Sequence, residues 1–181
     1  MEWLSKHIGL AKSLGEFQFK GWLDKNASEA LNEMGVKAGQ VVLDLGCGSG
    51  TYAIPAARIV GESGRVYAID KNKRALDVIR EKAKREGLKN TMPVEASGNE
   101  EIQLRAETID LALLIDVLQE IDDKRILFSE IHRILKPGGI ASVFPMHISE
   151  EEVQRAAAAS GLQLRGRVLQ GRIFIYRKPS Q

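Results

Sequence analysis

The sequence predicts an α/β fold in which a mostly parallel sheet carries helices on both faces. One observation is the stretch 41–50, where a short β-branched apolar run is followed by glycines at alternate positions. Such a run favours a strand buried on both faces, and a glycine loop that leads into a helix is typical of open α/β sheets. The second observation is the alternation of strand and helix patterns that follows, which indicates strands joined by helices.

Residues 1–35 are predicted to form a helical segment that precedes this core. Apolar residues at helical spacing predict a short amphipathic helix over 3–14, namely Leu4, Ile8, Ala11 and Leu14. Asn26, followed three residues later by Glu29, predicts the start of a second helix over 27–34. The first helix either packs on the core or covers the site as a lid, and adsorption to a membrane surface is a third alternative.

Residues 36–178 are predicted to be the core of the same single domain. After the first strand, helices are expected over 51–60, 72–86, 123–135 and 150–160, and strands over 65–69, 91–96, 109–115, 140–145, 162–169 and 172–176. Pro93 favours an edge position for strand 91–96, whereas the almost wholly apolar strand 109–115 is expected at the centre. The Lys-Pro-Gly-Gly run at 136–139 is expected to end a helix and to reverse the chain.

The composition is that of an ordinary globular domain. The 181 residues are 44% hydrophobic and 28% charged, and the net charge of +2 gives no strong signal for a nucleic-acid partner. A single cysteine excludes an intrachain disulfide and a multi-cysteine metal site, so no metal is expected. Since neither a membrane span nor a signal peptide is found, we expect a cytoplasmic protein.

The glycine spacing at 46–50 argues against two kinds of phosphate site. A dinucleotide loop has glycine where Thr51 stands, and the Gly-Lys-Ser/Thr of a P-loop is absent. A glycine turn without any ligand stays open as an alternative. Cys47, inside the loop, either fills a tight space or acts as a nucleophile, and the first interpretation is favoured.

Asp70 follows the second expected strand, twenty residues after Gly50. That is about the distance at which an acid holds the ribose of a nucleotide in related sheets. A carboxylate suits the task because it accepts hydrogen bonds from two adjacent hydroxyls. The alternative is that Asp70 caps the next helix.

Four features in order resemble the class I S-adenosylmethionine-dependent methyltransferases, in particular the ubiquinone and menaquinone biosynthesis enzymes. They are the Asp-x-Gly-x-Gly-x-Gly run at 44–50, Asp70, the strand and bend at 109–118, and Arg-Ile-Leu-Lys-Pro-Gly-Gly at 133–139. The resemblance implies a Rossmann-like seven-stranded sheet of order 3-2-1-4-5-7-6, with strand 7 antiparallel. It also implies S-adenosyl-L-methionine as cofactor, bound at the carboxyl ends of strands 1 and 4.

Carried onto this sequence, the resemblance assigns the methionine part of the cofactor to the glycine loop. Gly46 and Gly48 would contact it through their backbone, with Cys47 between them, and Asp44 would order its ammonium group. Asp70 would hold the ribose hydroxyls.

The same resemblance assigns the adenine and acceptor sides of the site. Lys71 would lie along one face of the adenine, where many relatives carry an apolar residue. Ala96 and Ser97 stand near the adenine amino group, where the family often has an aspartate. Asp116 and Val117 would face the sulfonium and the acceptor.

Two functions remain open on these grounds. The first is methyl transfer to a small-molecule acceptor, and the alternative is a non-catalytic S-adenosylmethionine-binding domain or subunit. Asp-Val-Leu-Gln stands at 116–119 instead of an Asn-Pro-Pro-Tyr-type motif, which disfavours methylation of nucleic-acid bases. A third alternative is a polyamine synthase, which uses a decarboxylated cofactor on the same fold. Such an enzyme would usually have more acidic residues around the amine substrate. His147, expected at the carboxyl end of strand 5, and Asp116 are the candidate catalytic residues.

Overall fold

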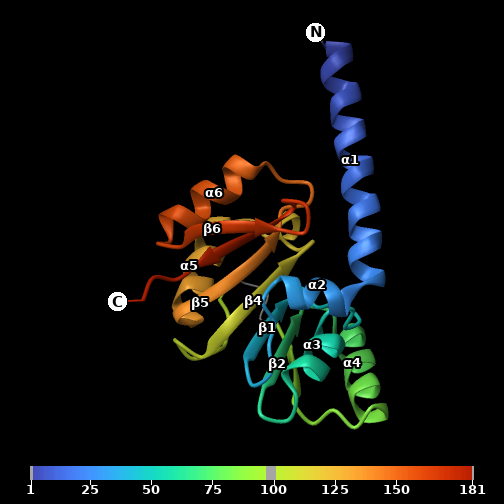
Figure 1. The fold of residues 1–181 in the computed structure, drawn as a ribbon, viewed down its shortest axis with the longest axis vertical. Coiled ribbons are helices and arrows are strands. Elements are labelled where there is room, and N and C mark those ends of the chain that lie inside the picture. The colour runs from blue at the N-terminus through green and yellow to red at the C-terminus, as the bar shows by residue number, and fades with distance from the viewer. Residues whose placement is uncertain (1, 97–100, 181) are drawn as a thin grey trace.

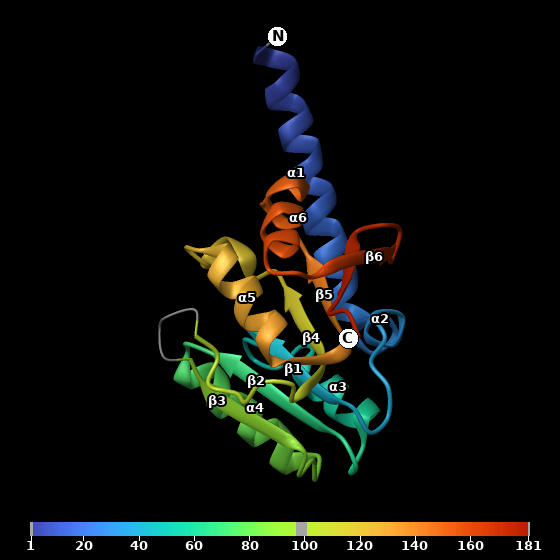
Figure 2. The same ribbon diagram turned by 90° about the vertical axis from the view of Figure 1, so that its left-hand side faces the viewer.

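The computed structural model describes residues 2–96 and 101–180, with side chains from residue 13 onward. Its sheet is built from β1 (Val41–Leu45), β2 (Arg65–Asp70), β3 (Thr91–Glu95), β4 (Ile109–Ile115), β5 (Leu135–Phe144), β6 (Gln163–Val168) and β7 (Ile173–Arg177). The strand order is β3-β2-β1-β4-β5-β7-β6, and β7 runs antiparallel to both of its neighbours. The predicted Rossmann-like sheet and the edge position of β3 are therefore confirmed (Figure 2).

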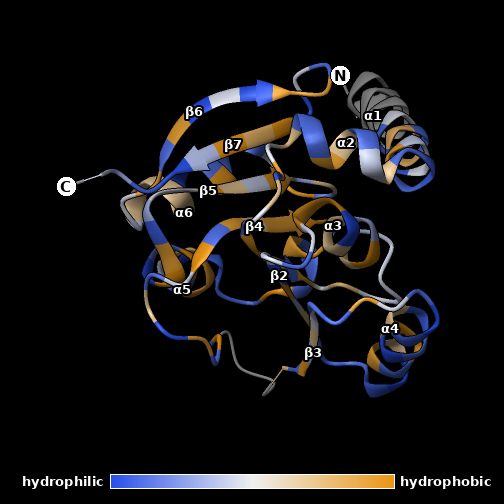
Figure 3. Cartoon of the chain, turned by 60° about the horizontal axis from the view of Figure 1, so that its bottom comes forward, coloured by the Kyte–Doolittle hydropathy of each residue, from blue (hydrophilic) through white to orange (hydrophobic). Residues whose placement is uncertain are grey.

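Helices cover both faces of this sheet. On one face, α2 (Ala27–Glu33), α3 (Ala53–Val60) and α4 (Lys73–Arg85) share an apolar core with the second half of α1 (Glu2–Lys25). On the other face, α5 (Lys124–Ile134) and α6 (Glu150–Ala159) form a second core, and a short 3-10 helix, η1 (Leu118–Glu120), follows β4. Figure 3 shows β4 as mostly hydrophobic at the centre and α4 with hydrophilic residues on its outer side.

The central strand β1 pairs in parallel with β2 and β4. Side chains alternate between the two faces of a strand. Val42 belongs to the core under α2 and α3, whereas Leu43 and Leu45 belong to the core under α5 and α6. Asp44 therefore points to the face that α1, α2 and α3 cover.

The N-terminal segment differs from the prediction, because one helix of 24 residues, α1, replaces the short helix expected over 3–14. Its N-terminal part stands clear of the body of the molecule (Figures 1 and 2). Glycine disfavours a helix by about 1 kcal/mol relative to alanine, and Gly15 and Gly21 both lie inside it. Burial of Phe19 and Leu23 offsets that cost and continues the helix to Lys25.

The Lys-Pro-Gly-Gly run also differs from the prediction. It ends α5, as expected, but the chain enters β5 at once at Leu135, so the run lies inside the strand. The pairing of β4 with β5 shifts register between Ile109 and Leu111, and this shift accommodates the Lys-Pro-Gly-Gly run within β5. No helix in the described part of the chain has the length and apolar character that crossing a membrane requires.

Candidate functional site

A cavity of about 370 Å³ opens at the carboxyl ends of β1, β2 and β4. This is the crevice that the topology predicts, because the sheet changes direction beside β1. The volume lies in the roughly 300–1,000 Å³ range of small-ligand pockets. The lining residues are Leu45, Gly46, Gly48, Ile69, Asp70, Lys71, Asn72, Ala75, Ala96, Asp116, Val117, Glu120 and Ile121.

The glycine loop after β1 forms one side of this cavity. Gly46 has a φ of +71°, and a Cβ atom there would lie 2.5 Å from Cγ2 of Val117, so only glycine fits. Gly48 has a φ of +49°, and a Cβ atom there would have no heavy atom within 4 Å. The space beside Gly48 is therefore open for a ligand.

Replacing Gly48 with alanine is expected to weaken ligand binding strongly while costing about 1 kcal/mol of folding stability through the left-handed backbone. Gly87 is a matched control, because its φ is +68°, its Cβ position is also open, and it does not line the cavity. Thermal unfolding and binding should be measured on both variants. Equal ligand affinity in the Gly48→Ala and Gly87→Ala variants would contradict this role of the loop.

Asp70 lies at the end of β2 and binds the backbone on both sides of the cavity. Its Oδ2 accepts a hydrogen bond from the N–H of Gly48, and its Oδ1 accepts one from Asn72, both at 2.8 Å. Each carboxylate oxygen can accept a second bond. The carboxylate therefore fixes the loop and keeps lone pairs for ligand hydroxyls, whereas Asn72 caps α4 with its own side chain.

Asp44 lies under the glycine loop and is only 1% exposed. The backbone N–H of Ala53 donates a hydrogen bond to its carboxylate. Its Oδ2 has no hydrogen-bond partner among the described residues. Burial and, to a smaller extent, the nearby Asp70 raise the pKa of Asp44 to about 7. A buried acceptor without a donor indicates that a ligand or water supplies one, and a cationic donor fits best.

An ion pair joins two residues that line the cavity. Nζ of Lys71, after β2, lies 2.7 Å from Oε2 of Glu120, in η1. The hydrogen bond to Glu120 raises the pKa of the Lys71 ammonium. Ala96 also lines the cavity, whereas Ser97 lies outside the described residues.

Asp116 and Val117 line the cavity at the end of β4. Asp116 has a φ of +56°, which is uncommon for a residue other than glycine. The side-chain amide of Gln119 donates to both the carboxylate and the carbonyl of Asp116, at 2.9 Å each. The carboxylate is thus held at the carboxyl end of β4. Strained backbone of this kind clusters at functional sites.

His147 follows β5, but it does not line the cavity. Its backbone N–H donates to Oε2 of Glu16 at 3.4 Å, and its ring packs edge-on against Phe17 at 5.9 Å. Both contacts come from α1. The structure therefore places His147 against the N-terminal helix and outside the cavity lining.

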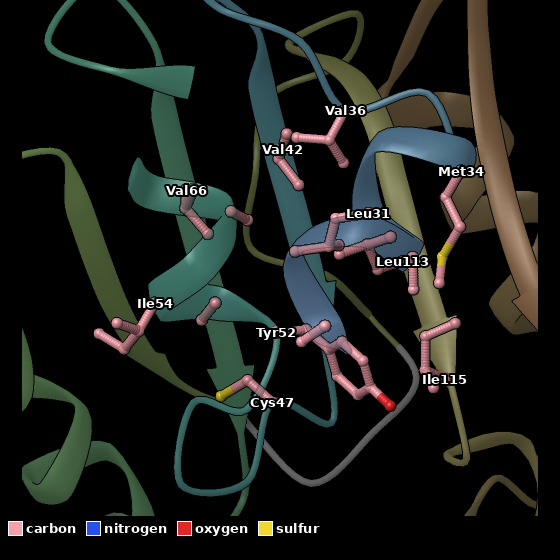
Figure 4. Close-up of a cluster of buried hydrophobic side chains, with 14 of the residues drawn as sticks. Leu31, Met34, Val36, Val42, Cys47, Tyr52, Ile54, Val66, Leu113 and Ile115 are labelled. Atoms are coloured by element: carbon pink, nitrogen blue, oxygen red, sulfur yellow. The ribbon is translucent and has the colours of Figure 1, made fainter. Parts of the chain in front are cut away.

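Cys47 lies in the buried core and outside the cavity lining, although it belongs to the glycine loop. It is 4% exposed, and Figure 4 shows it among the apolar side chains around Tyr52, Ile54 and Val66. Burial raises the pKa of its thiol, which opposes a role as a thiolate nucleophile. The position of Cys47 agrees with the interpretation that its side chain fills a tight space.

Six lining residues were not found from the sequence: Leu45, Ile69, Asn72, Ala75, Glu120 and Ile121. Asn72 and Ala75 had a signal, because they lie at the start of the helix that follows Asp70, at the carboxyl end of β2. Glu120 and Ile121 follow the bend after β4, and no local pattern indicates that they turn back over the cavity.

A comparison with known families decides what kind of protein this is. Residues 36–168 match the model of a methyltransferase domain. The chain belongs to this methyltransferase family. The matched range begins before β1 and ends in β6, so it includes the whole cavity described above.

Curated relatives resemble this methyltransferase over part of their length. It is 34% identical to the ubiquinone/menaquinone biosynthesis C-methyltransferase UbiE of Haemophilus ducreyi over 105 residues, which are 58% of this chain and 40% of the relative. It is 43% identical to a probable cobalt-precorrin-6B C(15)-methyltransferase of Saccharolobus solfataricus over 63 residues, 35% of this chain and 32% of that one. The chain thus spans less than half the length of each.

Among solved structures, the methyltransferase resembles a SAM-dependent methyltransferase from Aquifex aeolicus. The TM-score is 0.75 at 26% identity, over 86% of this chain and 90% of that one. The cofactor of this methyltransferase is S-adenosyl-L-methionine. The residues fit it: the buried unpaired oxygen of Asp44 suits an ammonium group, and the open side of Gly48 leaves room for the ligand.

Proposed function

We propose that this methyltransferase transfers the methyl group of S-adenosyl-L-methionine to a small-molecule acceptor. The observation that carries the proposal is the position of Gly48 and Asp70 in the cavity lining, with the buried Asp44 beneath the same glycine loop. Asp44 offers a buried acceptor for an ammonium group, Gly48 offers open backbone, and Asp70 offers a hydrogen-bonded carboxylate for ribose hydroxyls. The amino acid and the ribose follow each other in the cofactor in the same order.

In this proposal the cofactor lies with its methionine part at the glycine loop. Gly46 and Gly48 hold it through their backbone, and Asp44 takes its ammonium group. Asp70 holds the ribose hydroxyls with its remaining lone pairs. Lys71 and Ala96 lie beside the adenine, and the ion pair between Lys71 and Glu120 lies at the same part of the site.

The bound cofactor supplies an activated methyl group on a sulfonium. The task of the protein is then mainly to orient the acceptor and to exclude water, and orientation accounts for about 7–11 kcal/mol of barrier reduction in favourable cases. Asp116 and Val117 stand where the acceptor must approach, at the end of β4. Gln119 fixes the Asp116 carboxylate for that purpose.

The acceptor atom in this proposal is a carbon. Support comes from the two curated relatives, both of which are C-methyltransferases by name. A carbon acceptor must lose a proton, so a base is needed. Asp116 and His147 are the candidates, with Asp116 at the cavity and His147 beside Glu16.

The experiment is a screen of small-molecule acceptors with cofactor labelled in its methyl group. Label in a small organic product supports the proposal. The alternative function, a non-catalytic cofactor-binding subunit, predicts binding of the cofactor without transfer to any acceptor class. Label in RNA, DNA or protein, with none in small molecules, would contradict a small-molecule acceptor.

The pH dependence of turnover tests the base once an acceptor is known. If His147 is the base, the acidic limb of the profile disappears in the His147→Ala variant and the rate falls by about 10²–10⁴-fold. If Asp116 is the base, Asp116→Asn has that effect instead. Unchanged rates in both variants would mean that neither side chain moves the proton.

A further inference from the structure

On the second half of α1, two charged side chains lie on the same packed face as the buried apolar residues Phe19 and Leu23. They are Glu16 and Lys20, four residues apart, whose side chains are 11% and 20% exposed. Asp24, one turn further on, is 39% exposed. The packed face of a surface helix is normally apolar, and such local rules are broken mainly at functional sites.

Lys20 lies near Asp44, and neither side chain is among the residues that line the cavity. Its Nζ is 2.7 and 2.8 Å from the two carboxylate oxygens of Asp24, and 5.6 Å from the centre of the Tyr52 ring. The Tyr52 hydroxyl donates to Asp24 at 2.7 Å. Tyr52 directly precedes Ala53, whose N–H is bonded to Asp44. The Lys20 ammonium also acts to lower the pKa of Asp44, against the larger effect of burial.

The methionine part of the cofactor carries its ammonium and its carboxylate on the same carbon. With the ammonium at Asp44, the carboxylate lies within a few ångströms and needs a cation. Lys71 is the only cationic side chain among the described residues that line the cavity, and it is paired with Glu120. On the basis of the proposed function, we propose that Lys20 binds the α-carboxylate of the cofactor.

The contacts of Lys20 suit this role. An ammonium has three N–H donors, so Lys20 can hold Asp24 and a ligand carboxylate together. Asp24 is itself anchored by Tyr52, at the start of α3. In this arrangement the second half of α1 is a wall of the cofactor site.

The test compares two ligands by calorimetry: S-adenosylhomocysteine, and its decarboxylated form, which keeps the amine and lacks the carboxylate. The parent protein is expected to bind the first about tenfold to a hundredfold more tightly, the usual value of a hydrogen bond to a charged group. In the Lys20→Met variant, the affinity for S-adenosylhomocysteine falls by that factor, and the affinity for the decarboxylated form is unchanged. Lys25→Met, on the same helix and exposed, is the matched control and leaves both affinities unchanged.

Unchanged affinity of Lys20→Met for S-adenosylhomocysteine would overturn the inference, and so would an equal loss for both ligands. Equal affinity of the parent for the two ligands would overturn it without any variant, which covers the case in which Lys20→Met does not fold. Failure of both ligands to bind the parent would contradict the proposed function itself.

Discussion

Replacing Asp44 with asparagine is expected to weaken S-adenosylhomocysteine binding by tenfold to a hundredfold and to stabilise the free protein at pH 8. The affinity falls because a charged hydrogen bond, of about 1.5–3 kcal/mol, is lost. The stability rises because asparagine has the shape of the protonated acid and carries no buried charge. Asp44 is thus expected to oppose folding and favour binding.

The sign of the stability effect follows from the raised pKa. Burial raises the pKa of Asp44 from 3.8 in the unfolded chain to about 7 in the folded one. Between these values the folded state binds more protons, so the contribution of Asp44 is fully favourable below pH 4 and is lost as the pH rises through 7. One pKa unit corresponds to about 1.4 kcal/mol, so the whole effect is of the order of a few kcal/mol.

The measurement is thermal unfolding at pH 5 and pH 8, together with calorimetry of binding. The variant should unfold several degrees above the parent at pH 8, since about 1 kcal/mol moves the midpoint by ~2–4 °C in a domain of this size, and the gain should shrink at pH 5. Asp77→Asn, on the exposed side of α4, is the matched control and should change neither quantity appreciably. A destabilised Asp44→Asn variant with parental affinity would contradict this account.

Replacing Asp70 with alanine is expected to produce a comparable loss of affinity, tenfold to a hundredfold, together with a loss of stability. The ribose hydroxyls lose a charged partner. The N–H groups of Gly48 and Asn72 lose their acceptor as well, which costs on the order of 1–3 kcal/mol for each that stays buried. Folding should survive.

5′-Methylthioadenosine separates the roles of the two acids, because it keeps the ribose and lacks the amino acid. Asp70→Ala should weaken its binding, whereas Asp44→Asn should leave it unchanged. Calorimetry with this ligand and with S-adenosylhomocysteine measures both effects. If the Asp70→Ala variant is folded and binds both ligands as tightly as the parent, the proposed contact between Asp70 and the ribose hydroxyls is wrong.

The sequence predicts well what depends on local patterns. The apolar run 109–115 matches β4 at both ends, because all but one position of this strand, which is buried on both faces, is apolar. Gly48, Asp70, Lys71 and Asp116 all line the cavity, as their positions after parallel strands imply. The carboxyl ends of parallel strands meet at one edge, so sequence spacing alone brings these residues together.

The sequence does not predict what depends on the path of α1. Gly15 and Gly21 interrupt its helical pattern, and only the burial of Phe19 and Leu23 continues it. The neighbours of His147 and the position of Lys20 both follow from that path. The ion pair between Lys71 and Glu120 likewise joins residues 49 positions apart, after two different strands.

The central claim is that the crevice between β1, β2 and β4 holds one molecule of S-adenosyl-L-methionine and not a dinucleotide. Thr51 stands where a dinucleotide loop has glycine, and Asp70 stands at the ribose distance. Calorimetric titration of the unaltered chain with S-adenosylhomocysteine and with NAD tests the claim directly. The account predicts one site per chain for S-adenosylhomocysteine and no binding of NAD; micromolar binding of NAD with none of S-adenosylhomocysteine would contradict it.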